Sequence, residues 1–262
     1  MNVDLKGFTA IVGGCTQGIG KAIAEKFAAN GANLVLLARN RQKLESLAYE
    51  LQERYGVETL VVVADFDNPD ELDQKITEFF KTYTGSIDIL VNNVRGPMPA
   101  DLLDITPLQM HCVLQRHIVC NHTLALHVIP RMLSKQYGRI INIVDTIYHT
   151  PYPGLGLSTV RASEVSWAKA LSFEVAKDGI TVNNILPGPT DTDGFKEVMK
   201  IIAVEKGVSY EEFKQSVIEL VPVKRFAAPS EIANAALFLA SREAAYVTGT
   251  NLTIDGGFTP SI

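Results

Sequence analysis

The sequence predicts a single α/β domain built on a doubly wound, seven-stranded parallel sheet with helices on both faces. Short apolar runs alternate with longer amphipathic stretches along the 262 residues. Most of these runs are continuous stretches of Val, Ile and Leu, as in parallel strands buried on both faces. Strand–helix alternation repeated this often predicts right-handed crossovers within one sheet. The predicted strands are Phe8–Val12, Asn33–Leu37, Thr59–Val63, Ile87–Val91, Arg139–Val144, Thr181–Leu186 and Asn251–Ile254.

Apolar stripes and capping residues predict helices between the strands. The first stripe ends before Gly31, which is placed to terminate that helix. Asn68 and Pro69 predict a later helix start, because a cap, a proline at the first helical position and two acidic residues coincide there. Thr106 and Gln109 have the spacing of a capping box. The stripes are Ile19, Ala22, Ile23 and Phe27 in the first helix, and Val160, Glu164, Ala168, Leu171 and Val175 in a late helix that precedes Gly179.

No linker, repeat or low-complexity tract divides the chain, so residues 1–262 are expected to form one domain. Residues 193–221 interrupt the strict alternation and indicate a helical insertion between the last two strands. Such insertions commonly cover a binding cleft, so we expect this segment to be a substrate lid. Its mixture of apolar and charged side chains suits an acyl chain, a ring system or a small ketone equally.

Charge and composition disfavour several classes of function. The chain has 24 basic and 29 acidic side chains, a net charge of −5, which disfavours binding to a nucleic-acid backbone. The amino terminus lacks the regions of a secretion signal, and no apolar run is long enough to cross a membrane. Cys15, Cys112 and Cys120 have no paired spacing, which fits a reducing cytoplasm without disulfides. Four histidines on one predicted helix lack zinc-site spacing, so no metal is expected.

A glycine-rich loop, Gly13–Gly20, lies between the first predicted strand and the first predicted helix. Its glycines allow a sharp turn and a close approach of the backbone to a pyrophosphate. The following helix aims its first N–H groups and its positive dipole end at the same place. An ordinary turn also uses glycines, but the flanking strand and helix supply the context of a dinucleotide site. The expected cofactor contacts in the loop are Gly14, Thr16, Gln17, Gly18, Ile19 and Gly20.

The end of the second predicted strand indicates which dinucleotide is bound. A carboxylate at this place would bind the ribose 2′-hydroxyl of NAD, whereas this chain has Ala38-Arg39-Asn40. The planar guanidinium of Arg39 can pair with the 2′-phosphate of NADP. The alternative is a solvated arginine at a helix start. We therefore expect NADP(H) to be bound in preference to NAD(H).

Several motifs along the whole chain match those of one known family. The glycine loop is similar to TG-x-x-x-G-x-G, with Gly13 where threonine is usual, and Asn92-Asn93-Val94-Arg95 is similar to NNAG with its last two positions changed. The other matches are Ala64-Asp65-Phe66 with an adenine-contacting aspartate, Pro187–Thr192 with the PG-x-x-x-T segment that holds the nicotinamide carboxamide, and Tyr246–Gly249 through Asp255–Gly257 with the last strand and its DGG turn. The chain thus resembles the short-chain dehydrogenase/reductase family, and within it the β-ketoacyl carrier-protein reductase-like group.

The resemblance implies a Rossmann-type fold and a particular set of cofactor contacts. Beyond the glycine loop, the implied contacts are Arg39, Asp65, Phe66, Asn92, Arg161, Pro187, Gly188, Thr190 and Thr192. The resemblance also implies a homodimer or homotetramer, because the family forms interfaces with two long helices, here including the one with Trp167, and with the last strand.

The catalytic positions depart from the family. Its Asn-Ser-Tyr-Lys set falls on His117, Asp145, Leu157 and Arg161 of this chain. Leu157 has no proton to donate. Arg161 keeps the positive charge of the lysine and can bind the nicotinamide ribose, but it cannot deprotonate and relay. His117 is the one replacement whose unperturbed pKa lies near neutrality.

Reducing a ketone by hydride transfer requires a proton for the developing alkoxide. Besides His117, three residues that follow the fifth predicted strand at its carboxyl end are candidate donors, namely Tyr148, His149 and Tyr152. They also suit packing or lid roles. Asp145, if ionised, only accepts hydrogen bonds, and it can form an inert ion pair with Arg161 that fills the site.

Three functions agree with this pattern. The first is an NADP(H)-dependent oxidoreductase that interconverts a small carbonyl compound and an alcohol, with His117, Asp145 and Arg161 as catalytic residues. Arg161 would hold the ribose and support the oxyanion, while His117 or the 148–152 loop donates the proton. The second is a dinucleotide-binding pseudoenzyme, and the third is an elimination or isomerisation with Asp145 as base. The sequence favours the oxidoreductase, because a complete cofactor site would otherwise go unused.

Overall fold

Each of the seven apolar runs overlaps a strand of one parallel sheet in the computed structural model, which describes residues 3–146 and 154–260. The strands pair in the order β3-β2-β1-β4-β5-β6-β7. The order reverses between β1 and β4, which is where ligands bind in doubly wound sheets. The strands are β1 Thr9–Gly13, β2 Asn33–Ala38, β3 Thr59–Val63, β4 Ile89–Asn92, β5 Gly138–Ile143, β6 Ile180–Pro187 and β7 Asn251–Ile254.

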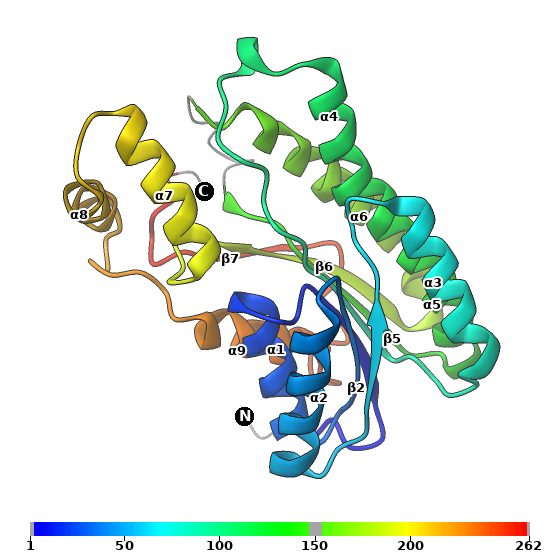
Figure 1. Cartoon of the computed structure of the whole chain (residues 1–262). Helices are drawn as coiled ribbons and strands as arrows, with labels where there is room; N and C mark the ends of the chain where they lie inside the picture. Colours follow the sequence, from blue (N-terminus) through cyan, green and yellow to red (C-terminus); the bar gives the residue numbers. More distant parts are fainter. Residues whose placement is uncertain (1–2, 147–153, 261–262) are drawn as a thin grey trace.

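Helices cover both faces of the sheet (Figure 1). The helices α1, α2 and α9 share one apolar core with one face, while α3, α5 and α6 share a second core with the other. The helices are α1 Gly18–Ala29, α2 Arg41–Tyr55, α3 Pro69–Thr82, α4 Pro107–Leu114, α5 Cys120–Lys135, α6 Val160–Val175, α7 Asp193–Glu205, α8 Tyr210–Leu220 and α9 Pro229–Ala240. The chain therefore has the predicted doubly wound, Rossmann-type architecture.

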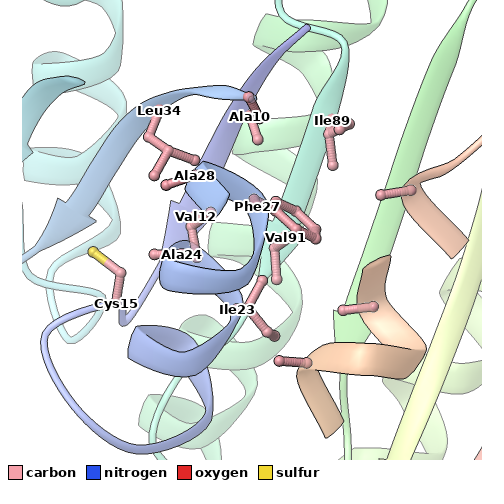
Figure 2. Packing of buried hydrophobic residues seen from close by; sticks show 14 of the residues in the cluster. Ala10, Val12, Cys15, Ile23, Ala24, Phe27, Ala28, Leu34, Ile89 and Val91 are labelled. Atoms are coloured by element: carbon pink, nitrogen blue, oxygen red, sulfur yellow. The ribbon is translucent and has the colours of Figure 1, made fainter. Parts of the chain in front are cut away.

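The first core fixes the position of α1 over the sheet. Figure 2 shows Ile23 and Phe27 of α1 directed toward the apolar side chains of the central strands, among them Val12 and Val91. These side chains are fully buried, and a core of this kind is packed as densely as an organic crystal. Since α1 cannot shift against the sheet, its amino-terminal end is held beside the carboxyl ends of β1 and β4.

Two local features, the start of α4 and the π-helical turn that follows it, lie on the opposite face of the sheet from α1, near the same strand ends. The capping box of Thr106 and Gln109 starts α4 as predicted. A π-helical turn, Gln115–Val119, then joins α4 to α5 and turns the side chains of Arg116 and His117 into the protein. The predicted insertion between β6 and β7 forms α7 and α8, which lie outside the two helical layers (Figure 1).

Candidate functional site

A cavity of about 1280 Å³ lies at the carboxyl ends of the central strands. Its walls come from the glycine loop, from the residues that follow β2, β3, β4, β5 and β6, and from α7 and α8. This is the position of the ligand crevice in open α/β sheets. The residues expected to contact the cofactor that line it are Gly14, Thr16, Gln17, Gly18, Ile19, Arg39, Asp65, Phe66, Arg161, Pro187, Gly188, Thr190 and Thr192.

The amino terminus of α1 is suited to a phosphate group. Side-chain caps from Asn40, Asn68, Thr106, Thr192 and Ser209 accept a backbone N–H at the starts of α2, α3, α4, α7 and α8. Among the described residues, no side chain caps α1 in this way. The first N–H groups and the positive dipole end of α1 therefore face the cavity without a protein partner, which fits the pyrophosphate of a dinucleotide.

Asn93 holds the glycine loop in its shape. Its side-chain amide donates to the backbone oxygens of Gly13 and Gly14, at 3.1 and 3.3 Å. Gly14 has a positive φ of 56°, and a Cβ there would lie 2.5 Å from the backbone oxygen of Asn93. A Cβ at Gly20 would lie 2.6 Å from the same amide group. Gly20 lies outside the cavity lining, and its lack of a side chain allows α1 to approach the loop.

Asn92 also lies outside the cavity lining. Its side-chain amide donates to Asn142 at 2.8 Å, Asn142 donates to Asn184 at 2.8 Å, and Asn184 donates to Asn251 at 2.7 Å. These four residues are register partners on β4, β5, β6 and β7. The side-chain amide of Asn92 belongs to this buried ladder, whereas that of Asn93 lies beside the glycine loop.

Three polar residues gather where an NADP 2′-phosphate is expected. Arg39 follows β2, its side chain is 61% exposed, and it lies 3.8 Å from Asp65. Asn40 and Lys43, from the first turn of α2, line the same part of the cavity. Of these three residues only Arg39 was predicted from the sequence, although Lys43 stands four residues later, in the first turn of the helix that follows.

A second charged cluster beside this end was not predicted. Asp67 accepts hydrogen bonds from Arg95 at 2.8 Å and from the buried Arg116 of the π-helical turn. Burial raises the pKa of the Asp67 carboxyl, but the two arginines outweigh this and lower it below its usual value. Arg95 stands at the last position of the NNAG-like motif, where the family has glycine. This departure from the motif was the sequence signal that could have indicated the cluster.

The segment that follows β6 shapes the other end of the cavity. Thr190 donates to the backbone oxygen of Gly188 at 2.8 Å, and Thr192 caps α7 by accepting the backbone N–H of Phe195. A Cβ at Gly188 would lie 2.5 Å from the side chain of Asp255, so the chain can pass here only with glycine. This fixed turn forms the part of the cavity wall that follows β6.

Leu157 is part of an apolar cluster. It is buried with Val113 and Val160 and lies outside the described cavity lining. Because leucine carries no polar group, this position, which the family resemblance predicts to be that of the proton donor, contributes packing only.

Arg161 lies at the centre of a buried polar network. Its side chain is only 3% exposed and donates to Glu164 at 2.6 Å and interacts with Nδ1 of His117 at 2.9 Å. Its Nε lies 3.5 Å from the carboxylate of Asp145, which is 25% exposed and lines the cavity. Asn121 donates to the other oxygen of Glu164 at 3.1 Å. The ion pair with Asp145 that the sequence allowed is present, but the closer partner of Arg161 is Glu164.

The opposite charges of Arg161 and its acidic neighbours stabilise one another in their ionised forms. Burial lowers the pKa of Arg161, but Glu164 and Asp145 outweigh it and raise the pKa above its usual value. Burial raises the pKa of Glu164, but Arg161 and His117 lower it below its usual value. The guanidinium of Arg161 and the carboxylate of Glu164 are therefore both ionised near neutral pH and form a buried ion pair.

His117 does not titrate near neutrality, although the unperturbed pKa of a histidine side chain led us to expect this. Burial and the nearby Arg161 lower its pKa to about 4, against the usual 6.5. It lies outside the described cavity lining, behind Arg161. No described residue bonds its Nε2 atom. Since the imidazole is neutral at pH 7 and does not reach the cavity, it is poorly suited to donate a proton to a substrate and instead positions Arg161.

The neutral, buried imidazole predicts a pH-dependent stability. Between pH 6.5 and pH 4 the unfolded chain binds a proton at His117 that the folded chain does not. Above pH 6.5 the neutral imidazole contributes about 3 kcal/mol to the free energy of unfolding. This contribution should be lost progressively as the pH falls from 6.5 to 4. His117→Asn should flatten this part of the curve of unfolding free energy against pH, measured in urea. His111→Asn, at an exposed position, is the control, and an unchanged slope in His117→Asn would refute the prediction.

The remaining candidate donors, Tyr148, His149 and Tyr152, lie outside the described residues. The insertion expected at 193–221 contributes apolar side chains of α7 and α8 to the cavity wall, including Phe195, Met199 and Phe213. Within residues 3–146 and 154–260, no group of three metal-ligating side chains is gathered, and no helix has the length and apolar character of a membrane span.

Comparisons with known proteins agree with this architecture. A family model described as Enoyl-(Acyl carrier protein) reductase matches residues 14–259. The chain therefore belongs to the short-chain dehydrogenase/reductase family. Within that family, it is of the 3-oxoacyl carrier-protein reductase-like kind.

Its relatives and structural neighbours match along nearly their whole length. The 3-oxoacyl-[acyl-carrier-protein] reductase of Aquifex aeolicus is 31% identical, over 98% of this chain and 99% of the relative. The NADPH-dependent reductase BacG of Bacillus subtilis is 29% identical, over 97% and 98%. The crystal structure of L-sorbose reductase from Gluconobacter frateurii, complexed with NADPH and L-sorbose, has a TM-score of 0.92 and 31% identity and covers 100% of both chains.

Proposed function

We propose that the protein is an NADP(H)-dependent oxidoreductase that interconverts a small carbonyl compound and an alcohol. The observation that carries the proposal is the uncapped amino terminus of α1 in the same cavity as the turn at Gly188 and the basic group of Arg39. NADPH bound there would supply a hydride. The relatives named above as NADPH-dependent, or solved with NADPH, support the same cofactor.

The residues that would hold the cofactor follow the cavity from end to end. Arg39, with Asn40 and Lys43, would bind the 2′-phosphate, Asp65 and Phe66 the adenosine, and the α1 terminus the pyrophosphate. In the rest of the cavity Gly14, Thr16, Gln17, Gly18 and Ile19 would line the phosphates, and Pro187, Gly188, Thr190 and Thr192 would hold the nicotinamide.

Arg161 and Asp145 would act on the reacting group. Arg161 lies at the cavity wall as a cation, so it would hold the nicotinamide ribose and stabilise negative charge that develops on a substrate oxygen. The carboxylate of Asp145 accepts hydrogen bonds, which suits the hydroxyl of an alcohol and its proton in the oxidation direction. His117 would act through Arg161 as a positioning residue.

The cofactor assignment is tested by calorimetric titration with NADPH and NADH. We expect NADPH to bind at least about tenfold more tightly, and Arg39→Glu to abolish this preference, because it removes the guanidinium and adds a charge that repels the 2′-phosphate. Arg54→Glu makes the same charge change at the far end of α2 and serves as the control. Equal affinities for the two nucleotides in the unmodified protein, or an unchanged preference in Arg39→Glu, would contradict the assignment.

One observation favours a second function, a cofactor-binding protein without turnover. Leu157 removes the family's proton donor, and Glu164 and Asp145 neutralise Arg161. Tight NADPH binding together with no cofactor oxidation in a screen of carbonyl and iminium compounds would support this function over the oxidoreductase.

We also propose that the protein forms a homodimer or homotetramer, as its family resemblance implies. The outer faces of α5 and α6 expose Leu126, Leu133 and Phe173, and Tyr246 is exposed beside the last strand. Exposed apolar side chains grouped in this way commonly form contacts between subunits.

A further inference from the structure

Two arginines at the nucleotide end of the cavity reach the same short acidic segment. This segment is Asp65-Phe66-Asp67, which follows β3. Arg39, which follows β2, lies 3.8 Å from Asp65, and Arg95, which follows β4, donates to Asp67 at 2.8 Å. All five residues line the cavity. Since β2 and β4 are the two neighbours of β1 in the sheet, the arginines come from the strands on either side of the one that leads into the glycine loop.

Arg95 belongs to the cavity wall that faces the glycine loop. The loop leads into α1, which covers one face of the sheet, whereas the chain from Arg95 leads to the π-helical turn and to α5, which covers the other face. The segment that holds Asp67 leads into α3, which covers that same second face. The ion pair of Arg95 with Asp67 therefore joins two loops of this wall, and the nucleotide end of the cavity lies between the ion pair and the glycine loop.

The position of Arg95 is fixed by its contacts on the side away from the glycine loop. Arg116 is buried in the π-helical turn, and its guanidinium donates to the carboxylate oxygen of Asp67 that Arg95 does not use. The backbone N–H of Asp67 donates to the side chain of Asp65 at 3.0 Å. Because Asp67 is held from two directions, it fixes one edge of the Arg95 guanidinium, while the Arg95 side chain itself remains half-exposed at the cavity wall.

A guanidinium held in this way suits a flat aromatic ring. The bond to Asp67 uses an N–H group at the edge of the guanidinium, which leaves its planar faces available for stacking. Asp67 also balances the charge of Arg95, which weakens the attraction of this arginine for a phosphate. The apolar side chains of Phe66 and Val94 line the same end of the cavity. A purine base, which is flat, uncharged and has a π-face that attracts a cation, therefore fits these surroundings better than a phosphate does.

We infer that Arg95 determines specificity for the purine base of the cofactor, on which its guanidinium stacks, and that Asp67 acts through Arg95 as a positioning residue. This inference rests on the proposed NADP(H)-dependent function and adds the recognition of the base to it. The two arginines of this end then have different roles, because Arg39 would bind the 2′-phosphate and Arg95 would bind the base that NADPH and NADH share. The family motif has glycine at the position of Arg95, and glycine has no side chain to make such a contact.

Replacing Arg95 tests this assignment with three ligands. Calorimetric titrations compare NADPH and NADH, which carry the purine, with reduced nicotinamide mononucleotide, which lacks it. In Arg95→Met, which has a long side chain without the charge, we expect NADPH and NADH each to bind about tenfold more weakly, within the range of cation–π contacts. The ratio of these two affinities and the affinity for the mononucleotide should stay unchanged. Arg41→Met removes an exposed, ion-paired arginine outside the described cavity lining, and this control should alter none of the three affinities.

A double-mutant cycle tests the role of Asp67. Asp67→Asn keeps the size of the side chain and removes the ion pair, so it should weaken the binding of NADPH and NADH and leave that of the mononucleotide unchanged. In Arg95→Met the same substitution should cause little further loss, because Asp67 acts through Arg95. Losses that multiply in the double variant would overturn the positioning role of Asp67. If Arg95→Met shows no cooperative unfolding transition in urea, Arg95→Gln replaces it in both experiments.

Failure of the proposed function and failure of this inference give different results. If neither NADPH nor NADH binds to the unmodified protein, both are overturned. If both nucleotides bind, and Arg95→Met binds them as tightly as the unmodified protein does, only the inference is overturned. It is also overturned if the loss in Arg95→Met is confined to NADPH, which would assign Arg95 to the 2′-phosphate, or if the mononucleotide loses affinity by the same factor, which would indicate a general change of the cavity.

Discussion

Replacing Glu164 by leucine is expected to destabilise the protein by about 3–5 kcal/mol. Glu164 is buried, accepts from Arg161 at 2.6 Å and from Asn121 at 3.1 Å, and is the closest carboxylate to that guanidinium. Among the described residues, the leucine leaves the buried cation with the more distant, partly exposed Asp145 as its remaining counter-ion. The loss is measured as the free energy of unfolding in urea at pH 7.

Three further variants test the reason for this loss. Glu164→Gln keeps the shape and the hydrogen-bonding oxygen, so it should lose less than the leucine variant and remain folded. Arg161→Leu combined with Glu164→Leu should recover most of the loss, since no unpaired charge stays buried. Glu174→Gln, an exposed acid-to-amide change on the same helix, should alter stability by less than about 0.5 kcal/mol. A leucine variant that unfolds like Glu174→Gln would show that Arg161 does not depend on Glu164.

The fold and the position of the glycine loop were predictable because their determinants are local in the sequence. A continuous apolar run such as Thr59–Val63 has the length and composition of a buried strand wherever it stands in the chain. The glycine loop can be recognised from the strand before it and the helix after it. Arg39 was identified for the same reason, since it directly follows a strand end.

Other parts of the site depend on contacts between distant segments. Glu164 stood in the helix stripe that was expected to be apolar, and a charged residue there, three positions after Arg161, was the available signal of a buried ion pair. The choice between Asn92 and Asn93 depends on which of them faces a neighbouring strand. The low pKa of His117 results from its burial in a π-helical turn. No local pattern in the sequence predicts this turn.

The reduction of a ketone such as 1-tetralone is expected to depend on the side chain at position 157, whereas that of a permanent iminium cation such as 2-methyl-3,4-dihydroisoquinolinium should not. Leu157 lies one helical turn before Arg161, and the family resemblance predicts that it replaces the tyrosine that donates the proton. Leu157→Tyr would place a phenol near this cation, which favours loss of its proton, and a general acid typically contributes a factor of 10²–10⁴ to proton transfer. We therefore expect the reduction of 1-tetralone by the Leu157→Tyr variant to rise by on the order of 100-fold.

The reduction of the methyl dihydroisoquinolinium ion should not change in the same variant, because that step uses no proton. The rates are measured with saturating NADPH on both probes, and Leu157→Phe supplies the same ring without the hydroxyl. A gain in tetralone reduction with Leu157→Phe equal to that with Leu157→Tyr would show that the ring, and not the proton, limits the reaction. A gain confined to Leu157→Tyr and to the ketone would instead show that the protein has a working hydride-transfer site to which a phenol at position 157 can supply the proton.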